Sequence, residues 1–538
     1  MKHACLYSRT PSTVPKSRTA WLQGVAICSL LAFASGAGAD EPRFELSAAT
    51  LPAYGLTPDP DAGAQALAPQ ADTPLARITF DKRALLAQAD PGAARPPDTV
   101  QLRKSPELWG ENKSYVIPAV EILGFDALLN VFDRAYFGGD DFDVTPSTIR
   151  RNLRRSWVKD SDSFSVNQLG HPYQGSMYHG FARASGLNFW EGFGYAFAGS
   201  AFWEIAGETT PPSKNDQINT SVGGAFLGET FFRMSNFWLE QGRGPRFWRE
   251  VAAAAISPPV GFNRLAFGDR YKAIYPSRNP EYYARLAVGV SAATQNRPGT
   301  ASEVKRNEAI VDFGFDYGLP GKPGYTYQRP FDYFAFQATG SSGVGFESVS
   351  TRGLLLGTDY GRQSNRYRGI WGLYGSYDYF APQIFRLASS AASVGTTLEW
   401  RPSDAIALQG TALAGLGYAS VSTIHDVANQ QSNRYGVAPQ ALLALRFIAV
   451  DRAALDLIAR EYFVSDVSGD PKGHDNVVRT EATLTWRLHK QHAIAIKYQF
   501  SQRDAQVPNL GDRTQSRGTL GIFYTLLGRD RFGSGDWR

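Results

Sequence analysis

Residues 477–501 read VVRTEATLTWRLHKQHAIAIKYQFS, and this stretch decides the fold class. Its two halves alternate between mostly apolar and mostly polar side chains with a period of two, which is the period of a β-strand. The apolar side chains stand at even positions from Val478 to Leu488 and again from Ile494 to Phe500. Because a short polar turn around Lys490 separates the halves, the stretch predicts two antiparallel strands joined by a tight turn.

The same period of two continues through residues 282–528. Most runs there have about 10 to 14 residues, whereas strands of soluble proteins usually have about 5 or 6. The runs number about twelve, and an even number of long strands is typical of bacterial transmembrane barrels. We expect these strands to begin near Ala284, Ala309, Phe331, Phe346, Arg368, Ala392, Ile406, Val437, Ala453, Val477, Ala493 and Arg517.

A soluble β-sandwich also alternates, so strand length and the joins between strands decide between the two classes. The joins at 450–452 and 487–491 are short, whereas those at 424–435 and 502–512 are longer and polar. Short turns at one end and long loops at the other are typical of periplasmic and extracellular ends. The sequence predicts an α+β membrane protein, with a C-terminal transmembrane antiparallel β-barrel over residues 282–528 and a barrel interior that is wet or plugged.

The N-terminal 108 residues are predicted to lie outside the folded part. Basic residues precede the apolar stretch VAICSLLAFA, and the small residues Ala37-Gly38-Ala39 follow it, so residues 1–39 have the form of a secretory signal peptide. Residues 40–108 are rich in Ala, Pro and Asp and carry too little apolar surface to offset the entropy of ordering. We interpret them as a disordered periplasmic arm. Together these features predict export to the bacterial outer membrane.

Charge and cysteine content exclude several functions. Without the four basic residues of the signal peptide, 51 Lys and Arg face 50 Asp and Glu, so no nucleic-acid partner is expected. Both cysteines, Cys5 and Cys28, lie in the predicted signal peptide, so the exported chain has no disulfide or thiolate chemistry. The expected partners are outer-membrane lipid and the barrel-assembly machinery, and the oligomeric state stays open.

Residues 109–248 change to runs of helical length and predict a small helical module. The stretch VIPAVEILGFDALLNVFDRAYFG has apolar residues at spacings of three and four and ends at Gly138-Gly139, which predicts an amphipathic helix. Three further helices are expected between Asn167 and Glu229, separated by Gly186 and by Pro211-Pro212-Ser213. Ser213 followed by Asp216 resembles a capping box at the start of the third.

Small and polar residues recur at intervals of four in these three helices, which places them along one stripe of each helix. Small residues at this spacing allow helix backbones to approach closely, so we expect a compact cluster in which His171, His179 and Arg183 neutralise Glu204, Glu208 and Asp216. The stripes are His171, Gly175, His179 and Arg183; Gly192, Ala196, Ser200, Glu204 and Glu208; and Asp216, Thr220, Gly224 and Gly228.

Two interpretations of the polar residues stay open. In the first, they form a buried network that holds the helices in register, and the structural members are Asn167, Arg183, Ser200, Asn215 and Glu229. In the second, His171 or His179 is a general base or metal ligand with Glu204, Glu208 or Asp216 as its carboxylate partner. The chain contains no HExxH, GxSxG or DxD-type motif, so the sequence predicts no metal and no cofactor, and favours a protein that is not an enzyme.

The module resembles the bacterial family of unknown function DUF3943, over about Trp109 to Trp248. The resemblance implies an exported protein of Gram-negative bacteria, with a barrel after the module, and implies no particular activity. It rests on the string HPYxG…WExxxE…PSxND…GGxxxGE, that is, Asn167, His171-Pro172, Gly175, Tyr178, Ala182-Arg183, Gly186, Ser200, Trp203-Glu204, Glu208, Pro212-Ser213, Asn215-Asp216, Gly223-Gly224 and Gly228-Glu229.

The functional prediction is an outer-membrane barrel protein in a structural, transport or envelope role, whose helical module caps the periplasmic mouth of the barrel or plugs its interior. The alternative is an outer-membrane enzyme that acts on lipid or cell-wall material through His171, His179, Glu204, Glu208 or Asp216. A passive pore is a third possibility. The sequence names no substrate or solute.

Overall fold

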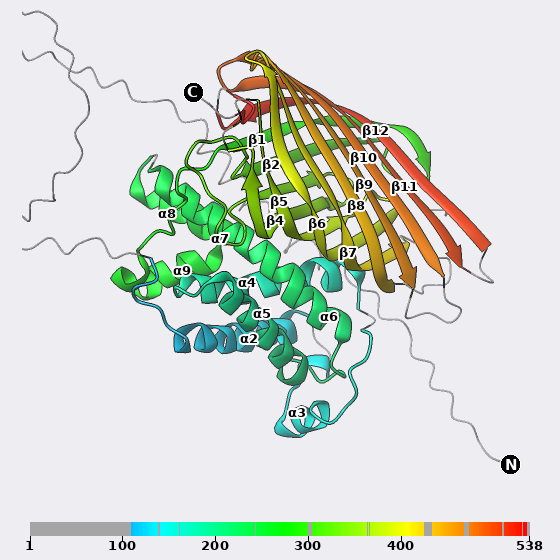
Figure 1. Ribbon diagram of the computed structural model, residues 1–538. Coiled ribbons are helices and arrows are strands. Elements are labelled where there is room, and N and C mark those ends of the chain that lie inside the picture. The colour runs from blue at the N-terminus through cyan, green and yellow to red at the C-terminus, as the bar shows by residue number, and fades with distance from the viewer. Residues whose placement is uncertain are drawn as a thin grey trace, which may run out of the picture. The chain divides into compact units, whose positions relative to one another are not determined.

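The computed structural model describes residues 109–137, 140–160, 162–242, 244–299, 304–362, 364, 366–423, 433–466, 473–507, 511–529 and 531–534. The predicted signal peptide and periplasmic arm lie outside the described residues. The described chain consists of a helical part followed by a sheet of twelve strands (Figure 1).

The helical part extends further along the chain than residues 109–248. Pro258 and Pro259 look like helix breakers, but they occupy the first turn of a helix, where the missing N–H has no partner to lose. No described helix is both long and apolar enough to cross a membrane. The elements are α2 (Val116–Phe137), η2 (Asp140–Phe142), α3 (Pro146–Asn152), η3 (Val166–Gly170), α4 (His171–Ala184), α5 (Phe189–Ala206), α6 (Lys214–Ile218), η4 (Asn219–Gly223), α7 (Gly224–Gln241), α8 (Arg246–Ile256), α9 (Pro258–Ala266) and η5 (Gly268–Tyr271).

The twelve strands pair antiparallel, each with its neighbours in sequence, and β1 pairs with β12 to close the barrel. This confirms the predicted architecture and strand number. The strands are β1 (Tyr282–Arg297), β2 (Asn307–Tyr317), β3 (Phe334–Ser341), β4 (Gly345–Tyr360), β5 (Tyr367–Phe380), β6 (Phe385–Ser403), β7 (Ile406–Thr423), β8 (Arg434–Ala449), β9 (Ala453–Asp466), β10 (His474–His489), β11 (His492–Val507) and β12 (Gly511–Leu527).

Two strand boundaries differ clearly from the prediction. β6 begins at Phe385 instead of near Ala392, because the small residues Ala388, Ser389, Ser390 and Ala391 occupy both faces and interrupt the alternation. The expected polar loop at 502–512 is mostly strand, since β11 continues to Val507 and β12 begins at Gly511. Backbone pairing extends these two strands beyond the apolar side chains on which the prediction depended.

The two ends of the barrel differ. We call the end with the joins at 318–333, 361–366, 404–405, 450–452 and 490–491 the turn end, and the opposite end, with the joins at 298–306 and 424–433, the loop end. Both predicted short joins lie at the turn end, and β1 starts and β12 finishes there. The expected division between short turns and longer loops holds only in part, because the longest join, 318–333, lies at the turn end and the joins 342–344 and 381–384 at the loop end are short.

The inner face of the barrel is polar, as the sequence predicts. Ion pairs cross the interior between strands that are not neighbours: Arg446 of β8 lies 3.0 Å from Asp316 of β2, and Lys497 of β11 lies 3.7 Å from Asp312 of β2. Arg479 of β10 likewise lies 3.7 Å from Glu347 of β4. Because side chains alternate along a strand, these contacts also identify the outward-facing residues of each strand.

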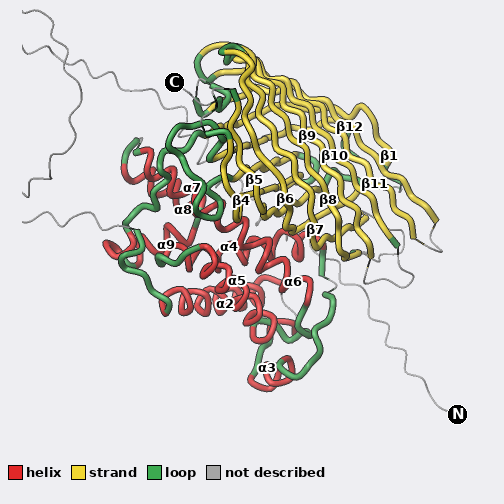
Figure 2. Tube along the Cα trace, viewed as in Figure 1, coloured by secondary structure: helices red, strands yellow, loops and turns green. Residues whose placement is uncertain are grey.

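The helical part packs on the outer wall of the barrel. Phe237 of α7 contacts the outward-facing Tyr282 and Phe315 with ring centroids 4.9 and 5.7 Å apart. About two turns earlier, Thr230 shares a 2.7 Å hydrogen bond with Thr351, whose neighbours on β4 face inward. α7 therefore crosses the outside of β5, β4, β3, β2 and β1, and Figure 2 shows it beside β4 and β5.

The predicted cap or plug is therefore wrong. The outward-facing aromatic side chains of β1–β5 give the module an apolar surface, whereas the inner face is occupied by ion pairs. The turn end is instead filled by the segment after β12. There Phe532 is fully buried against Tyr283, and the carbonyl oxygen of Gly533 accepts a 2.8 Å hydrogen bond from Gln409 on the inner face.

Within the module, the three predicted stripes face one another. His171, His179 and Arg183 of α4 are buried, as are Ser200 and Glu204 of α5. A Cβ atom at Gly175 would overlap the carbonyl oxygen of Thr220, and one at Gly228 would lie 2.9 Å from the carbonyl oxygen of Ser176. Backbone contact between α4 and the η4–α7 helix therefore requires glycine, as the spacing predicts.

We expect Gly175→Ala to destabilise the module by about 3 kcal/mol or more, because the new methyl group must displace backbone that has no room to move. Gly194→Ala is the matched control: no atom lies within 4 Å of its Cβ position, and alanine favours a helix by about 1 kcal/mol. Denaturant-dependent proteolysis of the two purified variants measures the difference. Equal stability of both would contradict the close α4–α7 packing.

Candidate functional site

The loop before α6 brings two acidic residues together. Ser213 caps α6, since its side chain accepts a 3.2 Å hydrogen bond from the backbone N–H of Asp216. The return bond of a capping box is not made, because the backbone N–H of Ser213 donates to Glu204 Oε2 at 2.7 Å. The carboxylate of Asp216 is therefore left to face the other helices.

Three side chains from three helices meet there, and we call them the histidine–carboxylate cluster: His171 at the start of α4, Glu204 near the end of α5, and Asp216 in α6. One donor atom from each lies within 4.8 Å of the others. The Nε2 atom of His171 is 4.0 Å from Asp216 Oδ1. All three side chains are buried, with Asp216 only 2% exposed.

A layer of amides and a barrel residue surrounds the cluster. Asn215 donates a 2.9 Å hydrogen bond to Asp216 Oδ1, and its Oδ1 accepts one of 2.8 Å from the backbone N–H of Asp160. Asn167 donates to Asp160 at 2.9 Å and to the hydroxyl of Tyr435 at 3.2 Å. Tyr435 belongs to β8, so the outer wall of the barrel contributes directly to the surroundings of the cluster.

The cluster disfavours negative charge. Burial, with Glu208 and Asp216 nearby, raises the pKa of Glu204 well above its usual range. Burial, with Asp160 nearby, does the same for the pKa of Asp216. Burial also raises the pKa of Glu208 to about 7. Among the described residues, neither Glu204 nor Asp216 forms an ion pair with Lys or Arg.

A second buried group, the glutamate–arginine network, joins α4 and α7 to the barrel. Glu229 accepts hydrogen bonds from His179 Nε2 at 3.1 Å, Arg183 Nε at 2.6 Å and Arg233 Nε at 2.8 Å. Burial alone would raise the pKa of Glu229, but Arg183, His179 and Arg233 hold it well below its usual range. Burial lowers the pKa of His179. The guanidinium of Arg183 lies over the rings of Phe232 and Tyr275.

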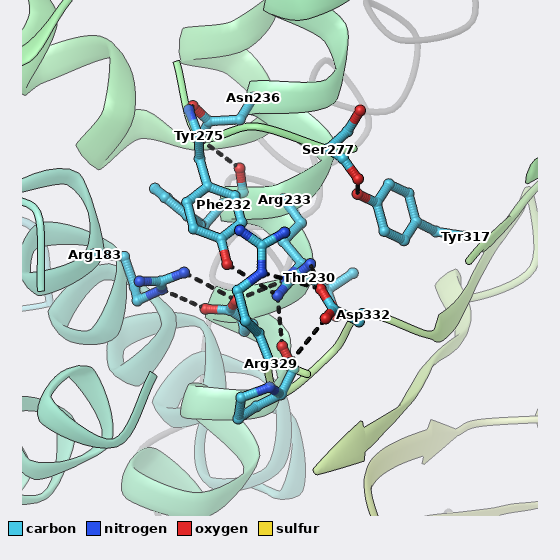
Figure 3. Close-up of polar contacts among 12 residues, drawn as sticks. Arg183, Thr230, Phe232, Arg233, Asn236, Tyr275, Ser277, Tyr317, Arg329 and Asp332 are labelled. Atoms are coloured by element: carbon cyan, nitrogen blue, oxygen red, sulfur yellow. Dashed lines mark hydrogen bonds and ion pairs between the residues drawn. The ribbon is translucent and has the colours of Figure 1, made fainter. Parts of the chain in front are cut away.

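Asp332, in the join between β2 and β3, completes this network. It accepts hydrogen bonds from Arg233 Nη1 at 3.1 Å and Arg329 Nε at 3.2 Å, and it pairs with Arg278 (Figure 3). Burial opposes its charge, but Arg233 and Arg329 keep the pKa of Asp332 below its usual value. The module is therefore linked to the turn end of the barrel by the buried charged chain Glu229–Arg233–Asp332.

The structure sorts the residues predicted for a site into two groups. His171, Glu204 and Asp216 come together with Asn167 and Asn215 around them. His179, Arg183 and Glu229 form the other group, so the expectation that His179 and Arg183 neutralise Glu204, Glu208 or Asp216 is wrong. Those two residues lie two and three turns along α4 from His171, where α7 presents Glu229.

Two predicted residues lie at the edge of the cluster. Glu208 follows α5 and accepts hydrogen bonds from Trp203 Nε1 at 2.8 Å and from Thr210 at 2.9 Å. Ser200 is 1% exposed, and its Oγ has no hydrogen-bond partner among the described atoms. Neither residue supplies a donor atom to the three that lie within 4.8 Å.

Sequence reasoning missed Asp160, Arg233, Asp332 and Tyr435. Arg233 carried a usable signal, since it follows Glu229 by four residues on an otherwise apolar helix, where an unpaired charge is costly. Asp332 and Tyr435 carried no such signal in the sequence, because they lie far along the chain in the barrel. Their contacts depend on the docking of the module.

Comparison with known proteins places a family within the module. The family described as "Domain of unknown function (DUF3943)" matches residues 156–259, which confirms the predicted resemblance. The match begins and ends later than Trp109 to Trp248. A search of curated protein sequences gave no match. None of the comparisons supports the alternative of an enzyme acting on lipid or cell-wall material.

The barrel is similar to solved outer-membrane barrels, at low scores. The NanC porin shares 9% identity, with 44% of this chain and 98% of that chain covered and a TM-score of 0.22. The outer membrane channel DcaP of Acinetobacter baumannii shares 8% identity, with 46% and 96% covered and a TM-score of 0.22. We draw no functional inference from similarity at this level.

We expect Glu229→Gln to destabilise the α4–α7 contact by on the order of 3–5 kcal/mol, because it leaves the buried Arg183 without its counter-charge and Arg233 with Asp332 alone. Glu250→Gln is the control, since Glu250 also pairs with an arginine but its side chain is 33% exposed, and its loss costs under about 1 kcal/mol. Hydrogen exchange of α4 and α7 peptides measures both. Unchanged protection in Glu229→Gln would refute a structural role for the network.

Proposed function

We propose that this protein is an outer-membrane barrel that acts as a membrane-embedded scaffold for the helical module docked on its outer wall, and that it is not an open diffusion pore. The observation that carries the proposal is the division of the outer wall into two parts. The module covers part of β1–β6 and reaches Tyr435 at the start of β8, and the rest of the outer wall exposes a continuous apolar surface.

The uncovered surface has the composition of a lipid-facing wall. An exposed apolar area of this extent is unfavourable in water and is the ordinary outer surface of a transmembrane barrel. Lipid contact at this surface supports placement in the outer membrane. Its side chains, each 40% or more exposed and outward-facing, are Val288, Val290, Leu416, Val437, Leu443, Phe447, Phe463, Leu484, Trp486, Ile494, Ile496, Tyr498, Leu520, Ile522 and Tyr524.

The helical module also exposes apolar side chains on the side away from the barrel. Val120, Leu123 and Val131 of α2 are at least 47% exposed, and Phe247 and Trp248 of α8 are 67% and 64% exposed. Aromatic residues on amphipathic helices favour the boundary between lipid headgroups and acyl chains. This supports a module that contacts the membrane while it is held by the barrel.

The interior of the barrel argues against free passage of solutes. Ion pairs join β2 to β8 and β11 and β4 to β10, and the tail around Phe532 occupies the turn end. A cavity of about 80 Å³ lies between them, lined by Tyr283, Arg285 and Arg446 among others. A space of this size holds a few waters, since one water occupies about 30 Å³ of liquid.

Lipid contact is testable because the chain has no cysteine beyond Cys5 and Cys28. We expect an NBD fluorophore on Ile496→Cys to be blue-shifted and quenched by brominated lipid chains in proteoliposomes. The same label on Ser342→Cys, in the exposed join between β3 and β4, should be neither blue-shifted nor quenched. Equal, water-like emission at both positions would exclude a lipid-facing wall.

We expect the full-length protein to give no stable porin-like conductance steps in planar bilayers, because its lumen is crossed by ion pairs. A chain truncated after Gly528 loses Phe532 from the turn end and should conduct more. Large, open-channel conductance of the intact protein would contradict the scaffold proposal and favour a pore.

A further inference from the structure

We infer that His171, Glu204 and Asp216 bind a divalent first-row transition-metal ion, of the class of Zn²⁺, Mn²⁺ or Fe²⁺, in the helical module. This inference goes beyond the scaffold function, which does not require a metal. It contradicts the expectation from sequence that the chain has no metal site, an expectation based on the absence of a contiguous ligand motif. The three ligands come from three separate helices, so no local sequence motif could indicate them.

The first argument is the geometry of the donor atoms. One nitrogen and two carboxylate oxygens lie within 4.8 Å of one another, with His171 Nε2 4.0 Å from Asp216 Oδ1. Three ligands of one ion, each about 2.0–2.2 Å from it in a tetrahedral site, lie about 3.3–3.6 Å apart. The donor atoms therefore need to approach one another by up to about 1.5 Å to hold an ion.

The second argument is the unused binding capacity of His171. Its side chain is 9% exposed, Nδ1 has no hydrogen-bond partner, and Nε2 is too far from Asp216 for a hydrogen bond. A buried imidazole ordinarily satisfies both nitrogens. Nε2 faces the two carboxylates instead of forming a bond of its own, which is the arrangement expected of a ligand.

The third argument is the contrast between the two buried polar groups of the module. Glu229 is neutralised by Arg183 and Arg233 at 2.6 and 2.8 Å. Glu204 and Asp216 are equally buried, but in the described part of the chain no Lys or Arg pairs with them. The cluster therefore lacks the positive charge that Arg183 and Arg233 give to Glu229.

The donor set selects the class of ion. Mixed imidazole and carboxylate ligands suit Zn²⁺, Mn²⁺ and Fe²⁺, whereas Mg²⁺ and Ca²⁺ prefer oxygen alone and Cu⁺ prefers sulfur. The hydrogen bond from Asn215 to Asp216 is of the kind that orients a ligating carboxylate. Three protein ligands would leave coordination positions open for water or another small ligand.

Zinc binding by the full-length protein tests the inference. The protein is purified in detergent without a polyhistidine tag, stripped with a chelator and titrated with Zn²⁺ against a chromophoric competitor. We expect one tightly bound ion per chain. His171→Gln and Glu204→Gln should each weaken binding by more than about 100-fold, because the loss of a ligand exceeds the 10- to 100-fold loss typical of outer-shell changes.

His179→Gln is the matched control, since His179 lies on the same helix and pairs with Glu229 away from the cluster. It should retain one zinc ion per chain. Heat-modifiable migration and far-UV circular dichroism establish that each variant is folded. Asp216→Asn is the variant of the third ligand. If it fails to fold, zinc binding by folded His171→Gln still decides the question.

Three results would overturn the inference. The first is that the folded wild-type protein binds no Zn²⁺, Mn²⁺ or Fe²⁺, which would mean that the two carboxylates share protons instead. The second is that His171→Gln and Glu204→Gln bind zinc as tightly as the wild type does. The third is that His179→Gln loses zinc binding to the same extent as His171→Gln, which would place the ion elsewhere.

Discussion

The contact between α7 and the outer wall of the barrel is the interaction on which the rest of the structure depends. Phe237 packs on Tyr282 and Phe315, and the hydroxyls of Thr230 and Thr351 meet at 2.7 Å. Lipid is as apolar as these side chains, so in a membrane the contact is stabilised by close packing and by polar bonds more than by exclusion of water. Outward-facing hydroxyls such as Thr351 find in α7 the partners that lipid could not provide.

Both buried polar groups follow from this docking. α7 presents Glu229 to His179 and Arg183, and it carries Arg233 to Asp332 in the barrel. At the other end of the module, Tyr435 of β8 meets Asn167 and Asn215, which surround the histidine–carboxylate cluster. The barrel thus serves as one wall of the module's core. A helical module released from the barrel would leave Arg233 without Asp332 at one end, and Asn167 and Asn215 without Tyr435 at the other.

The barrel could be predicted from the sequence because alternation along β10–β12 is a local property of each strand. The stripes at His171, Glu204 and Asp216 could be predicted because four-residue spacing is local to a helix. The side of the barrel on which the module lies could not be predicted. One local signal was present: Thr351 is a polar residue on the outer face of β4, where lipid offers its hydroxyl no hydrogen-bond partner. The pairing of His171 with Asp216 and of His179 with Glu229 depended on helix order in space, which spacing does not determine.

Disulfide formation tests the outer-wall docking most directly, since the predicted exported chain has no cysteine of its own. The Thr230→Cys/Thr351→Cys pair replaces two side chains whose oxygens are 2.7 Å apart, within reach of a disulfide. The Thr230→Cys/Ser350→Cys pair places the second cysteine on the inner face of the same strand. Outer-wall docking predicts that oxidation of outer-membrane vesicles cross-links the first pair and leaves the second reduced. Cross-linking of the second pair but not the first would place α7 inside the barrel and contradict the account.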